Sequence, residues 1–255
     1  MRSRPMELGP TLRIATWNVE RILPSQRRAM AIREGLRAAE ADVWVLTETH
    51  ELVGPAEGFS CCFSDQRTDA ERGERWAGIW SPLSLEPLPS FVSDTDFCTA
   101  ARIPDSSLGE LVVYGCVLPW TNAWRGVPAA GGQAFQEALA VQRGDWVKLR
   151  NRFPKATLIV AGDFNQDLAA RHYYGSKHKR ALLEAALDEV GLVALTAEGD
   201  DPVARESAPC ACIDHICVSR SAGWALHATM RWPDAPKPVA TISDHFGIAV
   251  DVVRR

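Results

Sequence analysis

Four short polar clusters in this 255-residue sequence carry side chains that could perform chemistry. Each cluster follows an apolar run, and together they supply carboxylate, amide and imidazole groups; the clusters are TWNVE (16–20), TETH (47–50), GDFNQD (162–167) and SDH (243–245). A rigid sheet can aim polar groups at its strand ends that a core would not tolerate, so this placement indicates a functional site. The inventory suits a hard, oxygen-seeking cation and a phosphate ester.

Hydrolysis of a phosphoester needs a water aimed at phosphorus and positive charge or donors for the phosphoryl oxygens. Glu48 ends an apolar strand, and we expect it to be the primary Mg²⁺ ligand, although a solvated strand-end acid is the alternative. The amide of Asn18 could hold a metal-bound water or the phosphate, or could simply belong to a turn.

Gly162-Asp163-Phe164-Asn165 is the sharpest local pattern, because glycine permits a tight turn and the alternation puts Asp163 and Asn165 on the same side. The carboxylate could orient or deprotonate the attacking water while the amide fixes the phosphate. The alternative for this segment is an Asx turn.

His245 could become cationic beside a phosphate. Asp214, within an apolar strand, needs a partner if it is buried, and orienting a histidine is as good an account as a core salt bridge. A Ser/His/Asp hydrolase is disfavoured, because adjacent residues such as those of SDH cannot readily form the relay and the sequence has no GxSxG motif.

The elements that must position these groups alternate between strands and helices. A helix is predicted with Ser25 as its cap, a second ends at Pro154, and a third spans about 178–190 and stops at Gly191. The residues between 76 and 118 predict an antiparallel meander. The strands are expected at 12–16, 42–46, 76–80, 85–91, 97–103, 110–118, 157–161, 192–196, 213–218, 224–230 and 247–253. Residues 11–255 are expected to form one domain after an extended or disordered segment, 1–10.

Composition narrows the class of protein. With 46% hydrophobic and 24% charged residues the chain is globular, and its net charge of −4 disfavours a protein whose main task is gripping duplex DNA. No secretory signal or membrane span is recognisable, and seven cysteines, an odd number, favour reduced thiols and a cytoplasmic location. The pair Cys210-Ala-Cys212 lacks the partners of a structural zinc site. A monomer without a protein partner is expected.

From Leu12 to Val253 the sequence resembles the endonuclease/exonuclease/phosphatase superfamily. The resemblance rests on five motifs that occur in the family's order: TWNVE, TETH, GDFNQD, IDHI and SDH. The resemblance implies a four-layer α/β sandwich, with two mixed sheets face to face and helices outside. It implies a metal site of Glu48, Glu20 and Asp244 that binds Mg²⁺, for which Mn²⁺ could substitute. The catalytic residues implied are Asn18, Asp163, Asn165, Asp214 and His245, with Asp214 orienting the histidine.

The sequence departs from the superfamily at the end of the central strand, where many relatives carry a His or Tyr that meets the substrate phosphate. The stretch Cys116–Leu118 offers neither group. A replacement could come from the basic, aromatic segment 171–180. The substrate-binding residues expected are therefore Arg171, Tyr174, Lys177, Arg180 and, after the central strand, Trp120. A solvated helix start and loop is the alternative for the segment, and core or rim packing is the alternative for Trp120.

These observations predict a divalent-metal-dependent phosphoester hydrolase, with phosphodiesterase or nuclease action on a nucleic acid or nucleotide-like substrate as the leading hypothesis. A phosphomonoesterase or a lipid or inositol phosphate phosphatase is the alternative enzyme. A phosphate-binding module without catalysis is the alternative of another class.

Overall fold

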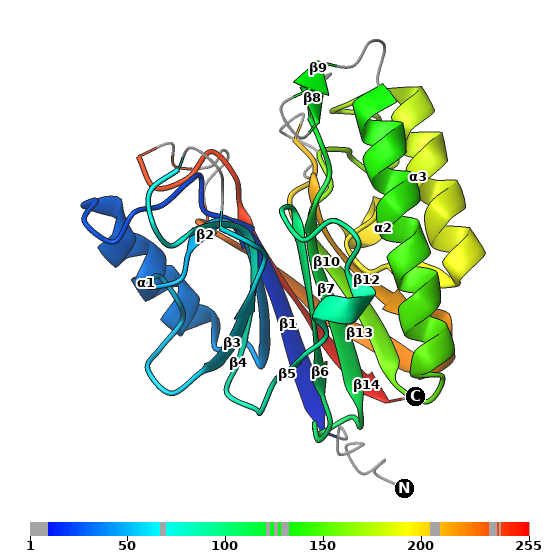
Figure 1. Cartoon of the computed structure of the whole chain (residues 1–255), viewed down its shortest axis with the longest axis horizontal. Helices are drawn as coiled ribbons and strands as arrows, with labels where there is room; N and C mark the ends of the chain where they lie inside the picture. The colour runs from blue at the N-terminus through cyan, green and yellow to red at the C-terminus, as the bar shows by residue number, and fades with distance from the viewer. Residues whose placement is uncertain are drawn as a thin grey trace, which may run out of the picture.

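The computed structural model describes residues 10–66, 70–120, 123–124, 127–128, 133–204, 210–234, 239 and 241–254. They form two mixed six-stranded sheets packed face to face, with helices on both outer sides (Figure 1). The architecture is the four-layer α/β sandwich that the sequence predicts. The N-terminal segment predicted to be extended or disordered lies, apart from Pro10, outside the described residues.

The first sheet combines the two ends of the chain. Its strand order is β13-β14-β1-β2-β4-β3, with β1 parallel to β2 and antiparallel to β14. The strands are β1 (Thr11–Asn18), β2 (Val43–His50), β3 (Ser60–Phe63), β4 (Glu74–Ser81), β13 (Trp224–Trp232) and β14 (Gly247–Arg254).

The second sheet has the order β11-β12-β10-β7-β6-β5, with β7 and β10 parallel and β12 antiparallel to β10. Its strands are β5 (Glu86–Pro87), β6 (Cys98–Ile103), β7 (Leu111–Val117), β10 (Thr157–Asp163), β11 (Leu192–Ala194) and β12 (Asp214–Ser219). A separate pair is formed by β8 (Ala123–Trp124) and β9 (Val127–Pro128).

Three hydrophobic clusters hold the layers together. Helix α1 (Arg28–Ala39) packs on the outer face of the first sheet, while α2 (Gln133–Arg152) and α3 (Lys177–Val190) pack on the outer face of the second (Figure 1). Between the sheets, alternate residues of the central strands interlock, as a strand's two-residue period requires. Short 3-10 turns cover Pro89–Phe91, Glu198–Asp200 and Arg220–Ala222.

Several sequence predictions about these elements are confirmed and others are wrong. Gly191 ends α3 in a left-handed conformation (φ 68°), as predicted. The predicted meander is confirmed for β5, β6 and β7, which pair antiparallel in succession in the second sheet, and is wrong for β4, which joins the first sheet. Ser25 does not cap α1: the Gln26 amide closes a turn on the Leu23 carbonyl, and the helix begins only at Arg28.

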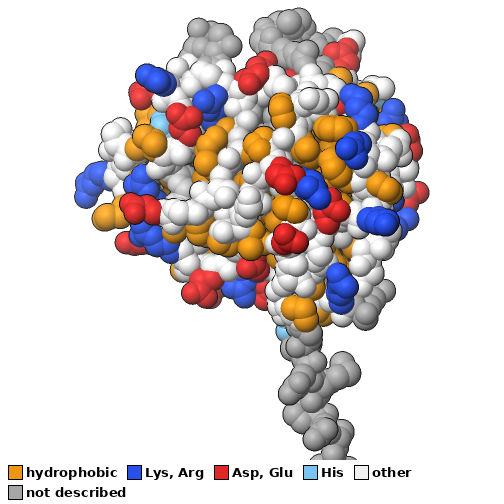
Figure 2. Space-filling view, turned by 60° about the horizontal axis from the view of Figure 1, so that its bottom comes forward, with side chains coloured by type: hydrophobic (Ala, Val, Ile, Leu, Met, Phe, Trp, Pro, Cys, Tyr) orange, Lys and Arg blue, Asp and Glu red, His pale blue; other side chains and the backbone are white. Residues whose placement is uncertain are grey.

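The surface and the cysteines agree with the composition. Lys and Arg side chains intermingle with Asp and Glu on the face in Figure 2, so the described residues of that face show no basic footprint. All seven cysteines are free thiols. Within the described part of the chain, no helix combines the length and apolar character needed to cross a membrane.

Candidate active site

Most of the predicted site residues lie around one cavity of about 590 Å³ at the end of both sheets. Strands β1, β2 and β10 end at this edge, whereas β12 and β14 run antiparallel to their neighbours and begin there. Strand ends and strand starts far apart in the sequence therefore meet. The predicted residues that line the cavity are Glu20, Glu48, Trp120, Asp163, Asn165, Tyr174, Asp214, Asp244 and His245.

Asn18 and Asp163 face each other across the two sheets because both continue a row of core residues. Leu12 and Ile14 precede Asn18 on one face of β1, and Ile159 precedes Asp163 on the inner face of β10. Buried Asn18 donates from Nδ2 to Asp163 Oδ2 at 3.0 Å and to Glu48 Oε1 at 3.2 Å. One amide thus joins the expected metal ligand to the expected base.

Glu48 reaches this amide through an unusual backbone. Strand alternation would place its side chain with Trp44 and Leu46, which pack against α1. Its φ of 48° instead lies in the left-handed region, which is sparsely populated by non-glycine residues. Glu48 also lies within β2 rather than at its end, because the strand continues to His50. The local backbone therefore redirects the carboxylate toward the cavity.

The GDFNQD turn is shaped by Gly162 and Asn165. Gly162 has a φ of 137°, and a Cβ there would lie 2.0 Å from the carbonyl oxygen of Cys116. Asn165 (φ 49°) donates its backbone N–H to Asp163 Oδ1 at 2.9 Å and its Nδ2 to Asp163 Oδ2 at 2.9 Å. The same Nδ2 lies 2.9 Å from the carbonyl of Leu118, which fixes the amide's orientation.

The electrostatics of Asp163 suit a general base. Burial raises the pKa of its carboxyl to about 7, assisted by the nearby charge of Asp214 and opposed by His245 and the Asn165 hydrogen bond. Asp163 and Asp214 are directly paired residues of β10 and β12, which explains their mutual influence. A carboxylate with a pKa near neutrality can accept a proton from water and release it again.

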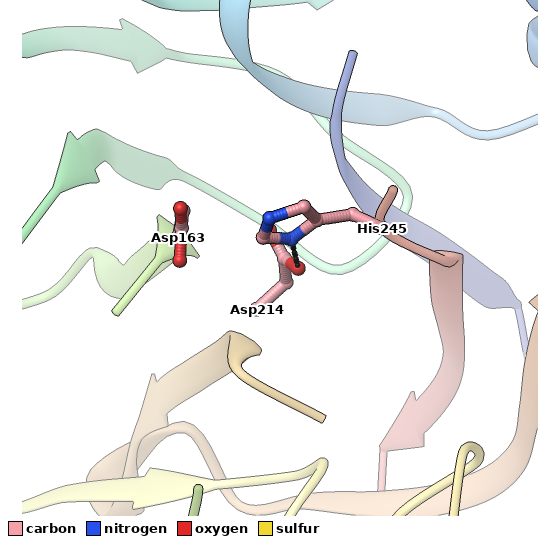
Figure 3. Close-up of side chains that lie close together, drawn as sticks. All are labelled: Asp163, Asp214 and His245. Atoms are coloured by element: carbon pink, nitrogen blue, oxygen red, sulfur yellow. Dashed lines mark hydrogen bonds and ion pairs between the residues drawn. The ribbon is translucent and has the colours of Figure 1, made fainter. Parts of the chain in front are cut away.

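His245 lies beside these acids and is held by Asp214 (Figure 3). Its Nδ1 lies 2.6 Å from Asp214 Oδ2. Burial by itself lowers the pKa of His245, but the charge and hydrogen bond of Asp214 outweigh it and raise the pKa to about 10. The imidazole is therefore protonated near neutral pH, and Nδ1–H donates to Asp214. The structure gives Asp214 a histidine partner, at the start of its strand rather than within it.

The segment before β14 is tied to the turn after β1. Ser243 donates from Oγ to the Asn18 carbonyl at 2.7 Å and accepts the His245 N–H at 3.1 Å. Trp17 donates from Nε1 to the His245 carbonyl at 3.2 Å. These bonds set the position of His245 relative to Asn18.

The donor set around Glu48 fits a hard divalent cation. Glu48, Glu20 and Asp244 offer carboxylate oxygens to one cavity, and the Glu20 and Asp244 side chains are 43% and 61% exposed. Mg²⁺ favours such oxygens and retains several waters. Asp163, Asp214 and His245 also bring one ligand atom each within 4.8 Å of one another. The Nδ1 of His245 is already bonded to Asp214, however, so the Glu48 side of the cavity, with its three carboxylates, fits better.

The predicted substrate-binding residues divide into two groups. Tyr174 and Trp120 line the cavity, whereas Arg171, Lys177 and Arg180 do not. Arg180 instead pairs with Asp167 at 3.5 Å and Glu184 at 2.8 Å. Buried Asp167 also accepts the Tyr174 N–H at 2.6 Å, so these residues hold the loop that carries Tyr174.

Tyr174 brings a phenol to the site where the central strand has none. Cys116, Val117 and Leu118 are buried, and the structure supplies no imidazole or phenol from these three residues. Burial and the charges of Asp163 and Asp244 raise the pKa of Tyr174, so its hydroxyl lies within electrostatic reach of both acids. It remains a neutral donor at ordinary pH.

Among the cavity-lining residues that sequence reasoning missed are Arg21 and Trp76. Arg21 directly follows the TWNVE cluster, and this adjacency is the sequence feature that could have indicated its place near the site. Trp76 lies on β4, where its ring stacks on Phe97 with centroids 4.9 Å apart. Nothing in the local pattern of β4 distinguishes Trp76 from a packing residue.

Fold and site together define a phosphoester hydrolase of the α/β sandwich type. A profile of the Endonuclease/Exonuclease/phosphatase family matches residues 15–245, and the chain belongs to this family. Its members include nucleases and phosphatases. The comparison with curated proteins gave no match.

Solved structures share the fold at low sequence identity. An AP endonuclease from Archaeoglobus fulgidus is 16% identical with a TM-score of 0.64, covering 94% of this chain and 98% of its own. A mannosyl-6-phosphatase from Bacteroides thetaiotaomicron is 17% identical with a TM-score of 0.64, covering 95% and 99%. A 3′ phosphatase from Neisseria bound to a DNA hairpin is 20% identical with a TM-score of 0.62, covering 94% and 98%. These similarities show the fold alone.

Proposed function

We propose that the protein is a Mg²⁺-dependent phosphodiesterase that acts on a nucleic acid or nucleotide-like substrate. The observation that carries this proposal is the Asn18 amide, which joins Glu48 to Asp163 across the two sheets. On the other side of Asp163, Asp214 holds a protonated His245. The base Asp163, the donor Asn18 and the cationic His245 thus meet at one cavity.

Each residue has a role that follows from its contacts. Asp163 accepts a proton from the attacking water, whose oxygen bonds to phosphorus as the bond to the leaving oxygen breaks. Asn18 and Asn165 orient the Asp163 carboxylate, and His245 donates to the phosphoryl oxygens as their charge develops. Asp214 keeps the imidazole protonated and oriented, and Tyr174 replaces the phenol or imidazole missing from the central strand.

Glu48, with Glu20 and Asp244, would hold the cation. When bound, Mg²⁺, or Mn²⁺ in its place, supplies positive charge to the phosphoryl group and a scaffold for waters. The aromatic rings of Trp120 and Tyr174 at the cavity favour a substrate with bases that can stack, because every base has a π-face. Seven free thiols support a reducing compartment, and we propose the cytoplasm.

The test is hydrolysis of bis-p-nitrophenyl phosphate with Mg²⁺ or Mn²⁺ by the wild type and by Asp163→Asn. We expect kcat to fall roughly 10²- to 10⁴-fold, the range that a general base contributes. Asp105→Asn is the matched control, because Asp105 is exposed in the turn between β6 and β7, at the other end of the sheet. Undiminished turnover by Asp163→Asn would refute the proposed role of Asp163.

A substrate panel under one metal condition then decides among phosphoesters. Plasmid DNA, single-stranded DNA, RNA, nucleotides and inositol phosphates separate the nuclease from the phosphomonoesterase and inositol phosphatase. Tight binding of a phosphate ligand without turnover of any of these would favour a binding module.

A further inference from the structure

The turn after β1 holds two successive non-glycine residues in the left-handed region, Glu20 (φ 52°) and Arg21 (φ 54°). Such conformations persist only where the surroundings fix them. Val19 and Ile22, on either side, are fully buried. The Arg28 guanidinium donates to the Val19 carbonyl at 3.2 Å and also to the Glu20 carbonyl. The turn is therefore held at both ends and presents the two side chains between them.

Arg21, in this turn, lines the cavity. The Ile22 N–H donates to the Glu48 carbonyl at 3.3 Å, which sets the turn against β2. The Arg21 side chain is 54% exposed, and its Nε lies 3.7 Å from Oε2 of Glu74, which is buried on β4. This ion pair is long, so the guanidinium keeps donors for a further anion.

The charge of the cavity makes Arg21 conspicuous. Among the described residues that line it, Arg21 is the one Lys or Arg, facing five carboxylates: Glu20, Glu48, Asp163, Asp214 and Asp244. An anionic substrate must overcome this negative field, and a guanidinium binds phosphate with paired donors. His245 and a cation held by Glu48 would serve the reacting phosphate, which would leave Arg21 for a different anion.

The ion pair with Glu74 places Arg21 at the first-sheet side of the cavity. Asp163 and Asp214 lie on the second sheet, whereas Glu74 lies on β4, two strands from β1 in the first sheet. Trp76 shares the face of β4 that carries Glu74, since the two residues are two apart. Trp76 also lines the cavity, with its ring stacked on Phe97.

We infer that Arg21, beside Trp76, forms a subsite for a second, non-reacting phosphate on the nucleotide substrate. The inference rests on the proposed function and deepens it: the preferred substrate carries a phosphate next to the one that is cleaved, as a polynucleotide strand does. Arg21 thereby distinguishes a strand from an isolated phosphodiester.

Two chromogenic esters that differ by one phosphate provide the test. The first is the p-nitrophenyl ester of thymidine 5′-phosphate, and the second carries an additional 3′-phosphate. We expect the wild type to prefer the second, and Arg21→Gly to reduce that preference in kcat/KM about 10-fold, as loss of one charge-assisted phosphate contact predicts. Glycine accepts a φ of 54°, so the substitution removes the guanidinium without adding backbone strain.

Controls separate this role from a structural one. Arg27→Ala removes a neighbouring exposed charge that does not line the cavity and should keep the wild-type preference. Arg21→Lys should recover part of the preference lost in Arg21→Gly. A preference within twofold of wild type in Arg21→Gly, with both esters affected equally, would overturn the inference.

A binding measurement keeps the two proposals distinguishable. Calorimetry compares thymidine 3′,5′-bisphosphate with thymidine 5′-phosphate on the wild type and Arg21→Gly. The ratio of the two Kd values should be about 10-fold smaller in Arg21→Gly than in the wild type. If the wild type hydrolyses neither ester, the proposed function fails, while an unchanged Kd difference in Arg21→Gly would separately refute the subsite.

Discussion

Gly162→Ala should damage both the fold and the site, because glycine alone fits this position near the end of β10. Its φ of 137° is a region that only glycine adopts readily, and the added Cβ would lie 2.0 Å from the Cys116 carbonyl oxygen. Backbone strain costs about 1–3 kcal/mol. The forced shift of β7 costs about as much again.

The expected loss in the free energy of unfolding is therefore about 2–6 kcal/mol, a large part of the about 5–15 kcal/mol that stabilises a typical native domain. Urea denaturation measures this loss, and the melting temperature should fall by about 2–4 °C for each kcal/mol in a chain of this size. Because Asp163 follows Gly162 directly, kcat should fall as well.

Gly144→Ala is the matched control. Gly144 lies within α2, and a Cβ there meets nothing within 4 Å. Alanine in a helix interior should therefore stabilise the protein by about 0.5–1 kcal/mol. If Gly162→Ala lost less than about 1 kcal/mol of unfolding free energy, below the backbone-strain range, the assignment of a strained, glycine-only turn would be refuted.

Two further predictions concern Tyr174 and His215. Tyr174→Phe should lower kcat/KM on bis-p-nitrophenyl phosphate about 10-fold if the phenol donates to the phosphate. Tyr173→Phe should lose less, because the Tyr173 hydroxyl accepts from the Cys210 thiol at 3.9 Å. Equal losses in the two variants would contradict the assignment. Burial lowers the pKa of His215, so the unfolded chain binds the extra proton first and stability falls as the pH drops below about 6.5, by at most about 1.4 kcal/mol per pH unit. Urea titrations in EDTA should show a shallower acid loss in His215→Gln than in wild type, and identical slopes would refute the neutral imidazole.

The neutral form of His215 is also what its hydrogen bonds specify. Its Nε2 lies 2.9 Å from the Gln166 carbonyl, which can only accept, so this nitrogen carries the proton. Thr196 Oγ1 accepts the Ile216 N–H at 3.2 Å and donates to Nδ1 at 3.0 Å. The buried ring is satisfied without a positive charge.

Much of the site was predictable because period-two alternation carries through to the strand ends. The apolar residues of β1 and β10 fix which face turns inward, so Asn18 and Asp163 follow from their rows. The redirection of Glu48 was not predictable, since its left-handed φ depends on bonds to a turn elsewhere in the chain. Arg180 was predicted to bind substrate because it is basic and follows the GDFNQD cluster. It forms an ion pair with Asp167 instead, which only the tertiary structure shows.

Sheet membership was the weakest part of the fold prediction. The predicted strands at 76–80 and 85–91 follow one another with turn residues between them, as hairpin partners do. The chain instead passes from one sheet to the other between β4 and β5. Local propensity holds no information about which of two stacked sheets a strand joins, because both offer the same hydrophobic face.

The first sheet is assembled from the two ends of the chain, and this has a consequence for catalysis. The bond from Ser243 to the Asn18 carbonyl spans 225 residues, and the pair Arg13–Asp251 spans 238. Closing the long loops between such partners costs conformational entropy and is therefore slow. The residues of the proposed site cannot come together before the terminal strands have docked. A nascent or C-terminally truncated chain that lacks β14 should therefore be unable to assemble this cavity, however well its second sheet has formed.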